Sequence, residues 1–287
     1  MIKRNYYALV AGLPDIVSDD KKMAFSTTQF RSMLKGDLHS SDFALVRLFF
    51  IPFDHNNLIN LLFKKDAPWD ERGNMTKADM EIVVDKKQFH LNEEFKVPAY
   101  LSHLVEIAHD EEAIENEQIA QRKLTEKYYA LLLSQKNNFV RDVAQYQITA
   151  TNIMTALNGR KHGISFENDL VGNSEVVKAL NKSKSRDFGL SREIENIEEF
   201  IQIFETDHLL ERELKVDNHF WNYLEDRTFF HYFTIERVLA FLLKLFIVER
   251  WVSLDKQRGE EMFNKLLEEL NTAFQFPEEF TLGYGKR

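Results

Sequence analysis

The hydrophobic positions of this chain recur with helical spacing over most of its length. Between Glu111 and Arg160 apolar residues return every three or four positions, which predicts one long helix, or two helices with a break near Asn137 and Asn138. The same spacing, with polar caps and breaks, predicts helices over 29–34, 54–63, 98–110, 209–224, 229–254 and 260–274, and others beginning at Ser40, Ser174 and Ser191. The stretch 64–96 is polar and mixed and is interpreted as an excursion. We therefore expect an all-α fold of about ten helices.

Three segments of the chain share a similar apolar sequence pattern: Ile51–Leu62, Tyr146–Leu157 and Ile235–Leu254. The first two copies share an asparagine followed by similar apolar residues, at Asn57 and Asn152. The third copy shares the spacing of apolar residues, and Gly259 follows it as Gly163 follows the second copy. A recurrence at roughly 90 residues predicts similar helical units. We expect a single domain over 1–287, with units 1–97, 98–190 and 191–287, that presents a surface rather than a catalytic pocket.

Composition supports helices and limits the classes of partner. Five prolines and ten glycines are few for 287 residues. The net charge of −9 would repel phosphate backbones and anionic lipid, so nucleic acid is not an expected partner. The absence of cysteine excludes disulfides and thiolate chemistry. The apolar run near Tyr7 is too short for a signal peptide, and Val238–Val248 is too short for a membrane span. We expect a soluble, cytoplasmic protein.

Two Glu-x-x-His pairs suggest metal chemistry: Glu106 with His109, and Glu205 with His208. Paired motifs of this kind hold the metals of di-iron carboxylate bundles. Against this interpretation, an acidic stretch typical of a solvated helix end follows the first pair, and a helix cap interrupts the second. Chance pairs are also expected in a chain so rich in glutamate. A di-iron oxidoreductase stays the alternative, and the main expectation contains no cofactor, metal or catalytic residue.

Two further features bear on partner binding. Seven aromatic residues lie between Phe220 and Phe233, more than one helix face can bury. Most are expected in a helix–helix corner of the core, and part of the cluster is expected to face a partner. The basic stretch Asn158–Gly163 lacks the spacing of a phosphate-binding loop. It is interpreted as a helix C-terminus favoured by the dipole, with contact to an acidic partner as the alternative.

Several segments resemble a known family, the C-type subunit of V-type and archaeal-type ATPases, which is the d-type subunit of eukaryotic complexes. Asn152–Gly163 resembles its Asp-x-x-Asn-Ile-x-x-x-Leu-Arg-x-[Arg/Lys] element, although Thr149 stands where that family has Asp. The stretch 235–270, with Phe241 and Lys244, resembles the last helix pair of the same family. The beginning, Tyr7–Ile16, resembles a bacterial family of uncharacterised proteins encoded beside V-type ATPase subunits.

The resemblance implies a funnel of three helical units about a pseudo-threefold axis, with no catalysis of its own. Such a protein sits on the membrane rotor ring and receives the central shaft, and it is peripheral to the membrane through protein contacts. Residues of the socket would then be Asn57, Asn152, Arg160, Glu249 and Arg250. Each of them could equally serve as a helix cap or an intrahelical partner. The prediction is a coupling subunit of a V-type ATPase, with a helical scaffold for an unrelated partner as a further alternative.

Overall fold

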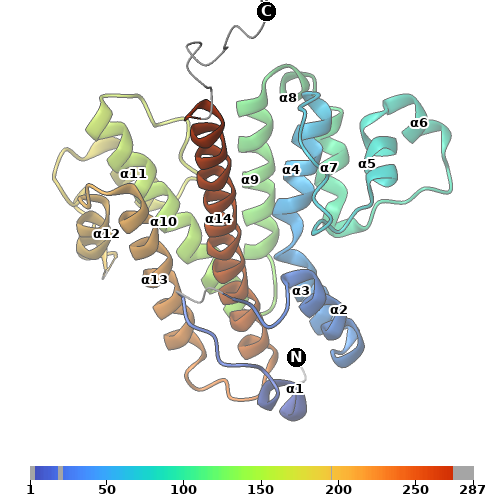
Figure 1. Ribbon diagram of the computed structural model, residues 1–287, viewed down its shortest axis with the longest axis horizontal. Helices are drawn as coiled ribbons and strands as arrows, with labels where there is room; N and C mark the ends of the chain where they lie inside the picture. Colours follow the sequence, from blue (N-terminus) through green and yellow to red (C-terminus); the bar gives the residue numbers. More distant parts are fainter. Residues whose placement is uncertain (1–3, 19–21, 195, 274–287) are drawn as a thin grey trace, which may run out of the picture.

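The fold is all-helical, as predicted (Figure 1). The computed structural model describes residues 4–18, 22–194 and 196–273, and it describes side chains as far as Asp255. These ranges contain no strand. Their helices are α1 (Tyr7–Ala11), α2 (Thr27–Asp37), α3 (Ser40–Leu48), α4 (Ile51–Leu62), α5 (Lys77–Val84), α6 (Lys86–Leu91), α7 (Ser102–Ala108), α8 (Glu111–Glu115), α9 (Glu117–Leu133), α10 (Asn138–His162), α11 (Glu175–Lys182), α12 (Ile197–Phe204), α13 (Leu209–Thr228) and α14 (Ile235–Ala273), with a 3-10 turn at Ala99–Leu101.

Capping side chains determine where the helices begin. The predicted break near Asn137 is confirmed, because the Asn137 side chain accepts a hydrogen bond from the N–H of Val140 and so begins α10. Ser26 and Gln29 form a reciprocal capping box at the start of α2. At its other end α10 stops at Gly163, whose φ of 64° is a left-handed conformation that glycine adopts without strain.

Several predicted bounds were wrong, and the stretch expected to be helical from Glu111 has a further break at Asn116, whose side chain caps α9. The helix expected from Ser191 begins at Ile197, after a series of turns. The helix expected over 229–254 begins at Ile235, so that residues 229–234 form a link. α14 then continues past Gly259 to Ala273 and absorbs the separate helix expected over 260–274. A glycine inside a helix costs only about 1 kcal/mol, which the flanking helix formers can offset. The excursion 64–96 contains the short helices α5 and α6.

The chain forms three helical hairpins, each a helix followed by a turn and a long helical segment. The first is α2 with α3 and α4, the second is α9 with α10, and the third is α13 with α14. α3 and α4 are separated only by Phe49 and Phe50, and Pro52 stands in the first turn of α4, where it removes no helical hydrogen bond. The pair α3–α4 therefore occupies the place that the single helix α10 has in the second hairpin.

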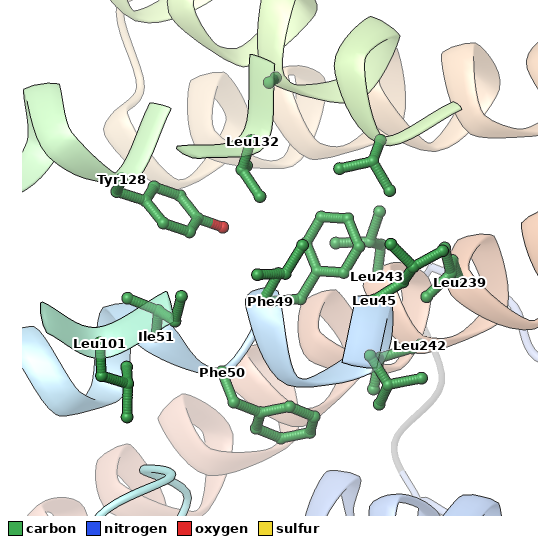
Figure 2. Close-up of a cluster of buried hydrophobic side chains, with 14 of the residues drawn as sticks. Leu45, Phe49, Phe50, Ile51, Leu101, Tyr128, Leu132, Leu239, Leu242 and Leu243 are labelled. Atoms are coloured by element: carbon green, nitrogen blue, oxygen red, sulfur yellow. The ribbon is translucent and has the colours of Figure 1, made fainter. Parts of the chain in front are cut away.

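The hairpins share one hydrophobic core at their turn end. Residues from the first halves of the long segments pack together there, including Leu45 of α3, Val140 of α10 and Leu239 of α14. Figure 2 shows part of this cluster, with Phe49 and Phe50 between α3 and α4 close to Leu242 and Leu243 of α14. Full burial of one such side chain stabilises the fold by about 1.5–3 kcal/mol.

A second core lies around the later half of α10. Ile153 and Leu157 of this helix pack with α11 and α12, including Leu180 and Phe200. α10 thus joins both cores, and it carries α11–α13 to one side of α14 while α4–α9 lie on the other (Figure 1). The long segments are therefore close at their turn end and separate away from it.

Candidate functional site: a cleft at the turns of the hairpins

The turns of the three hairpins meet around a cleft of about 560 Å³. The α9–α10 turn and the α13–α14 link form two of its walls, and the start of α3 with the N-terminal segment forms the third. The lining side chains are Arg4, Asp42, Lys136, Asn137, Asn138, Phe139, Asp142, Asp226, Arg227, Phe230, His231, Thr234, Ile235 and Glu236. This volume lies within the range of sites that bind small molecules or partner side chains.

Polar contacts connect the second and third turns across the cleft. Asn137, which caps α10 through its oxygen, donates from Nδ2 to a carboxylate oxygen of Glu236 at 2.9 Å. Glu236, in the first turn of α14, also accepts a short hydrogen bond from the hydroxyl of Thr234, which immediately precedes this helix. One carboxylate therefore fixes the α9–α10 turn against the beginning of α14.

The N-terminal segment connects the third turn to the first. The N–H of Tyr6 donates to the carbonyl of Phe233 at 2.7 Å, and the Tyr6 hydroxyl donates a short hydrogen bond to Asp42 in the first turn of α3. Arg4 lies 3.6 Å from the same carboxylate. Burial, and then the hydrogen bond to Asp42, raise the pKa of Tyr6 to about 12, so the phenol keeps its proton.

The charges of the cleft are mixed and partly unpaired. Arg227 pairs with Asp142 across one wall. Lys136 and Asp226, of opposite sign, have no ion-pair partner among the described residues. The positive ends of α3 and α14 meet Asp42 and Glu236 in their own first turns, which balances these two helix dipoles, and Asp142 and Asp226 add two further carboxylates to the lining. The cleft is therefore not arranged as an anion site.

An exposed group of aromatic side chains stands beside the cleft. We call Tyr7, Phe229, Phe230, Tyr232 and Phe233 the aromatic corner. Phe229, Phe230 and Tyr232 are 65 %, 79 % and 64 % exposed. By contrast, Phe220 and Tyr223 of the same sequence cluster stack against Tyr146 at ring distances of 5.1 and 4.3 Å. The cluster is thus divided between packed and exposed rings.

Two of the residues selected from the sequence make the same contact in different hairpins. Asn57 of α4 donates from Nδ2 to the carbonyl of Asp70 at 2.9 Å and accepts from its N–H at 3.0 Å. Asn152 of α10 makes the same pair of bonds with Val171, at 2.9 and 2.8 Å. We call this contact the asparagine clasp. Each clasped loop leads to a helix with a hydroxyl cap, α5 after the first and α11 after the second.

The first clasp has an additional anchor in Asp54, one turn before Asn57. Its fully buried carboxylate accepts hydrogen bonds from the N–H groups of Asn74 and Met75 and from the Asn74 side chain. Gly73 approaches so closely that a Cβ there would lie 2.7 Å from an Asp54 oxygen. The second hairpin has Thr149 at the equivalent position, beside an open groove.

In the third hairpin Glu249 stands at the same distance from the first residue of α14 as Asn152 does from that of α10. It is also buried, but it binds the other end of the chain. Its carboxylate accepts from the N–H of Thr27 at 3.1 Å and from the Thr27 hydroxyl at 2.6 Å, and Arg72 lies 3.5 Å away. Glu249 therefore fixes α14 to the beginning of α2.

The two arginines selected from the sequence also have partners within the chain. Arg160, in the last turn of α10, donates to the carbonyl of Ser185 at 2.6 Å and lies 3.5 Å above the ring of Phe188. Arg250 is half-exposed and pairs with Asp217 of α13. Neither arginine lines the cleft, nor do the two asparagines or Glu249. Whether any of the five also contacts a partner stays a prediction.

In the structure, the four residues of the two Glu-x-x-His pairs each contact different partners. Glu106 pairs with Lys127, and His109 lies 2.9 Å from the carbonyl of Val83. Glu205 pairs with Arg186, whereas His208 caps α13. Within the described ranges no group of three or more His, Asp or Glu side chains is placed to hold a metal ion. The di-iron alternative therefore finds no assembled site in this part of the molecule.

Sequence reasoning did not identify the residues of the cleft. They come from turns and helix starts of three separate hairpins, and no periodic pattern connects them. The excess of aromatic residues between Phe220 and Phe233 was the one signal of this region. In the described residues, no helix is both apolar enough and long enough to cross a membrane.

Comparison with known proteins gives a family and no relative of known activity. No curated protein matches the chain, and no solved structure does. One family model, described as a protein of unknown function (DUF2764), matches residues 3–273. That match spans nearly the whole chain, and the protein belongs to this DUF2764 family.

Proposed function

We propose that this chain is a non-catalytic coupling subunit of a V-type ATPase, which links the membrane rotor ring to the central shaft. The observation that carries the proposal is the asparagine clasp, made by Asn57 with Asp70 and by Asn152 with Val171. Asn152 begins the stretch that resembles the C-type family, and Asn57 repeats its contact in another hairpin. A repeated helical scaffold of this kind is suited to presenting surfaces to partners.

The arrangement of the hairpins supports the same function. A protein that transmits torque must resist deformation, and here Asn137–Glu236, Tyr6–Phe233 and Glu249–Thr27 connect successive hairpins and the two ends of the chain. The cleft and the aromatic corner supply a surface for a partner at one end of this scaffold. The protein would then lie on the cytoplasmic side of the membrane, held there by protein contacts alone.

Purification of the tagged protein from its native cells tests the proposal. In mild detergent we expect it to co-purify with rotor-ring and central-shaft subunits in near-equal amounts, as measured by mass spectrometry. Recovery of the protein by itself, or with unrelated soluble proteins, would contradict the proposal. The second outcome would favour the other candidate function, a helical scaffold for a different partner, which the exposed aromatic corner also suits.

A further inference from the structure

A groove lies beside Thr149 in the second hairpin, at a position that is covered in the first. Asn57 and Asn152 make the same clasp, and Asp54 and Thr149 each stand three positions before the clasping asparagine. The two positions are therefore equivalent. Asp54 is fully buried, whereas Thr149 lines a groove of about 410 Å³ between α10, α12 and α13. We call this space the Thr149 groove.

In the first hairpin a loop of the chain itself covers the equivalent position. The carboxylate of Asp54 accepts hydrogen bonds from the N–H groups of Asn74 and Met75, at 2.6 and 2.9 Å. The same loop begins at the clasped residue Asp70 and ends at Thr76, the cap of α5. A polypeptide segment therefore fills this place over the first long helical segment.

The corresponding loop of the second hairpin is shorter. Thr76 lies six positions after the clasped Asp70, whereas Ser174, the cap of α11, lies only three positions after the clasped Val171. The difference equals the length of Gly73–Met75, the part of the first loop that lies against the carboxylate beneath it. The Thr149 groove is therefore the place that a loop of this length fills in the first hairpin.

An arginine completes the cover of the first hairpin. Arg31 of α2 donates from Nη1 to the carbonyls of Arg72 and Gly73, at 2.7 and 3.1 Å. Its guanidinium also lies 4.5 Å from the centre of the ring of Phe50, which stands one helical turn before the buried carboxylate. A planar guanidinium is suited to stacking on a ring while it donates several hydrogen bonds at once.

The Thr149 groove offers rings and negative charge to a side chain of this kind. Tyr146 and Tyr223 line it, with their ring centres 4.3 Å apart. Asp142 and Arg227, which also line it, pair with each other. Glu193 lines it as well, is exposed, and has no ion-pair partner in the described part of the chain. The lining therefore carries one negative charge that is not neutralised.

A neutral histidine leaves this negative charge unchanged. His219 lines the groove, with Nδ1 2.6 Å from the hydroxyl of Tyr146. Its Nε2 lies 3.2 Å from a carboxylate oxygen of Glu199 but is not aligned for a hydrogen bond. Burial lowers the pKa of His219 below the ordinary 6.5, although Glu199 acts in the other direction, so the ring is neutral at pH 7. Glu199 therefore adds to the negative charge near the groove.

We propose that the Thr149 groove binds a polypeptide segment of a partner protein, which takes the place of the loop of the first hairpin and lays an arginine side chain against Tyr146 and Tyr223. Its guanidinium pairs with Glu193. A nucleic acid or an anionic lipid surface would be repelled by the unpaired charge of the lining. The inference goes beyond the proposed function and does not depend on it.

Binding of arginine-containing peptides tests this inference. An array of short random peptides is probed with the labelled full chain, and the strongest binders are titrated against it by fluorescence anisotropy. We expect these binders to be enriched in arginine. Replacement of the arginine by citrulline, its neutral analogue, should weaken binding about tenfold or more, because the charge-assisted hydrogen bonds are lost.

Two substitutions locate the binding in the groove. Glu193→Lys should weaken binding about tenfold, since it places a like charge beside the guanidinium, and the thermal midpoint should not change because this side chain is exposed. Thr149→Trp fills the groove and should abolish measurable binding. The matched control is Glu81→Lys, which makes the same change of charge at an exposed residue of α5, on the other side of α14 (Figure 1).

The control variant should bind the selected peptides as the unsubstituted chain does. Equal losses for Glu81→Lys and Glu193→Lys would show an effect of net charge alone and would overturn the inference. An array without binders, or binders that keep their affinity for both groove variants, would also overturn it.

Other outcomes would assign the groove to a different occupant. Binding of spermidine or of arginine amide as tight as that of the peptides, and equally sensitive to Glu193→Lys, would make the groove a site for small amines. Citrulline peptides that bind as well as arginine peptides would remove the arginine from the account. The proposed function is tested separately by co-purification, so either proposal can fail while the other stands.

Discussion

The side-chain amide of Asn152 forms two hydrogen bonds with the backbone of Val171, one through Nδ2 and one through Oδ1. Asn57 forms the same pair with Asp70, although 13 residues separate that pair and 19 separate the other. The amide of asparagine is suited to this contact, because it offers a donor and an acceptor side by side. The repeat within this chain is therefore a repeated contact as well as a repeated sequence.

Loss of the second clasp should destabilise the protein. Asn152→Ala leaves the N–H and carbonyl of Val171 without partners in a buried place, which should lower the free energy of unfolding by roughly 2–4 kcal/mol. Asn158→Ala is the control, because Asn158 is exposed on the same helix and should change stability by less than about 0.5 kcal/mol. Urea unfolding followed by circular dichroism measures both. Equal effects of the two substitutions would contradict the structural role of the clasp.

The contact between Glu249 and Thr27 should couple the two ends of the chain energetically. A double-mutant cycle with Glu249→Gln and Thr27→Val should give a coupling energy of about 1–2 kcal/mol, since the two side chains share a buried hydrogen bond. In a parallel cycle Thr28→Val replaces Thr27→Val, and its coupling to Glu249 should be close to zero. Chemical denaturation supplies the energies. A coupling with Thr27 as small as that with Thr28 would mean that the buried bond does not connect α14 to α2.

Asp54 should make stability depend on pH in an unusual direction. Burial raises its pKa from 3.8 to about 6, against the lowering effect of its hydrogen bonds to Met75 and Asn74. The folded protein therefore binds this proton more tightly than the unfolded chain does. The contribution of Asp54 to stability is full below pH 3.8 and is lost as the pH rises to about 6.

Comparison with Asp54→Asn isolates this effect. The difference in free energy of unfolding, original protein minus variant, should fall by about 1–3 kcal/mol between pH 4 and pH 7. Urea titrations across that range measure the difference. A difference that stays constant, or that rises with pH, would show that the hydrogen bonds from the anchored loop outweigh burial in their effect on the pKa of Asp54.

A buried pair of histidines should make stability depend on pH in the opposite direction to Asp54. The Nε2 atoms of His55 and His103 lie 2.8 Å apart, so one ring donates and the other accepts, and both are neutral. Burial lowers the pKa of His55 to about 3 and that of His103 to about 4, below the ordinary 6.5. Their contribution to stability is thus full above pH 6.5 and is lost as the pH falls, because only the unfolded chain gains the protons.

His103→Gln should flatten this dependence. Each titrating histidine contributes a slope of up to about 1.4 kcal/mol per pH unit, so the variant should lose stability less steeply than the original protein between pH 6 and pH 4.5. Thermal unfolding or urea titration at several pH values gives the slopes. Equal slopes for the two proteins would mean that the pair is protonated, or open to water, in the folded state.

The sequence determined the helical class and identified Asn57 and Asn152 as a repeated pair, because the first depends on local periodicity and the second on a short repeated motif. The bonding partner of Glu249 could not be predicted, since Thr27 lies 222 residues away and only the closed arrangement of hairpins brings the two together. Likewise, the continuation of α14 through Gly259 depends on its surroundings more than on the propensity of one residue.

The cleft shows why the candidate site was harder to predict than the fold. Its residues belong to turns, where neither helical spacing nor a motif constrains the sequence. The aromatic excess between Phe220 and Phe233 correctly indicated that some rings would be exposed. It could not show which ones, because exposure depends on where α13 ends, at Thr228, and the helix was expected to end at Leu224.

Ion pumping by membrane vesicles tests the proposed coupling function most directly. Inverted vesicles from cells depleted of this chain are supplied with ATP, and hydrolysis and acidification or sodium uptake are followed together. The account predicts hydrolysis without ion uptake, and recovery of uptake when the purified protein is added back. Vesicles that pump normally without the chain, with hydrolysis and uptake still coupled, would contradict the account.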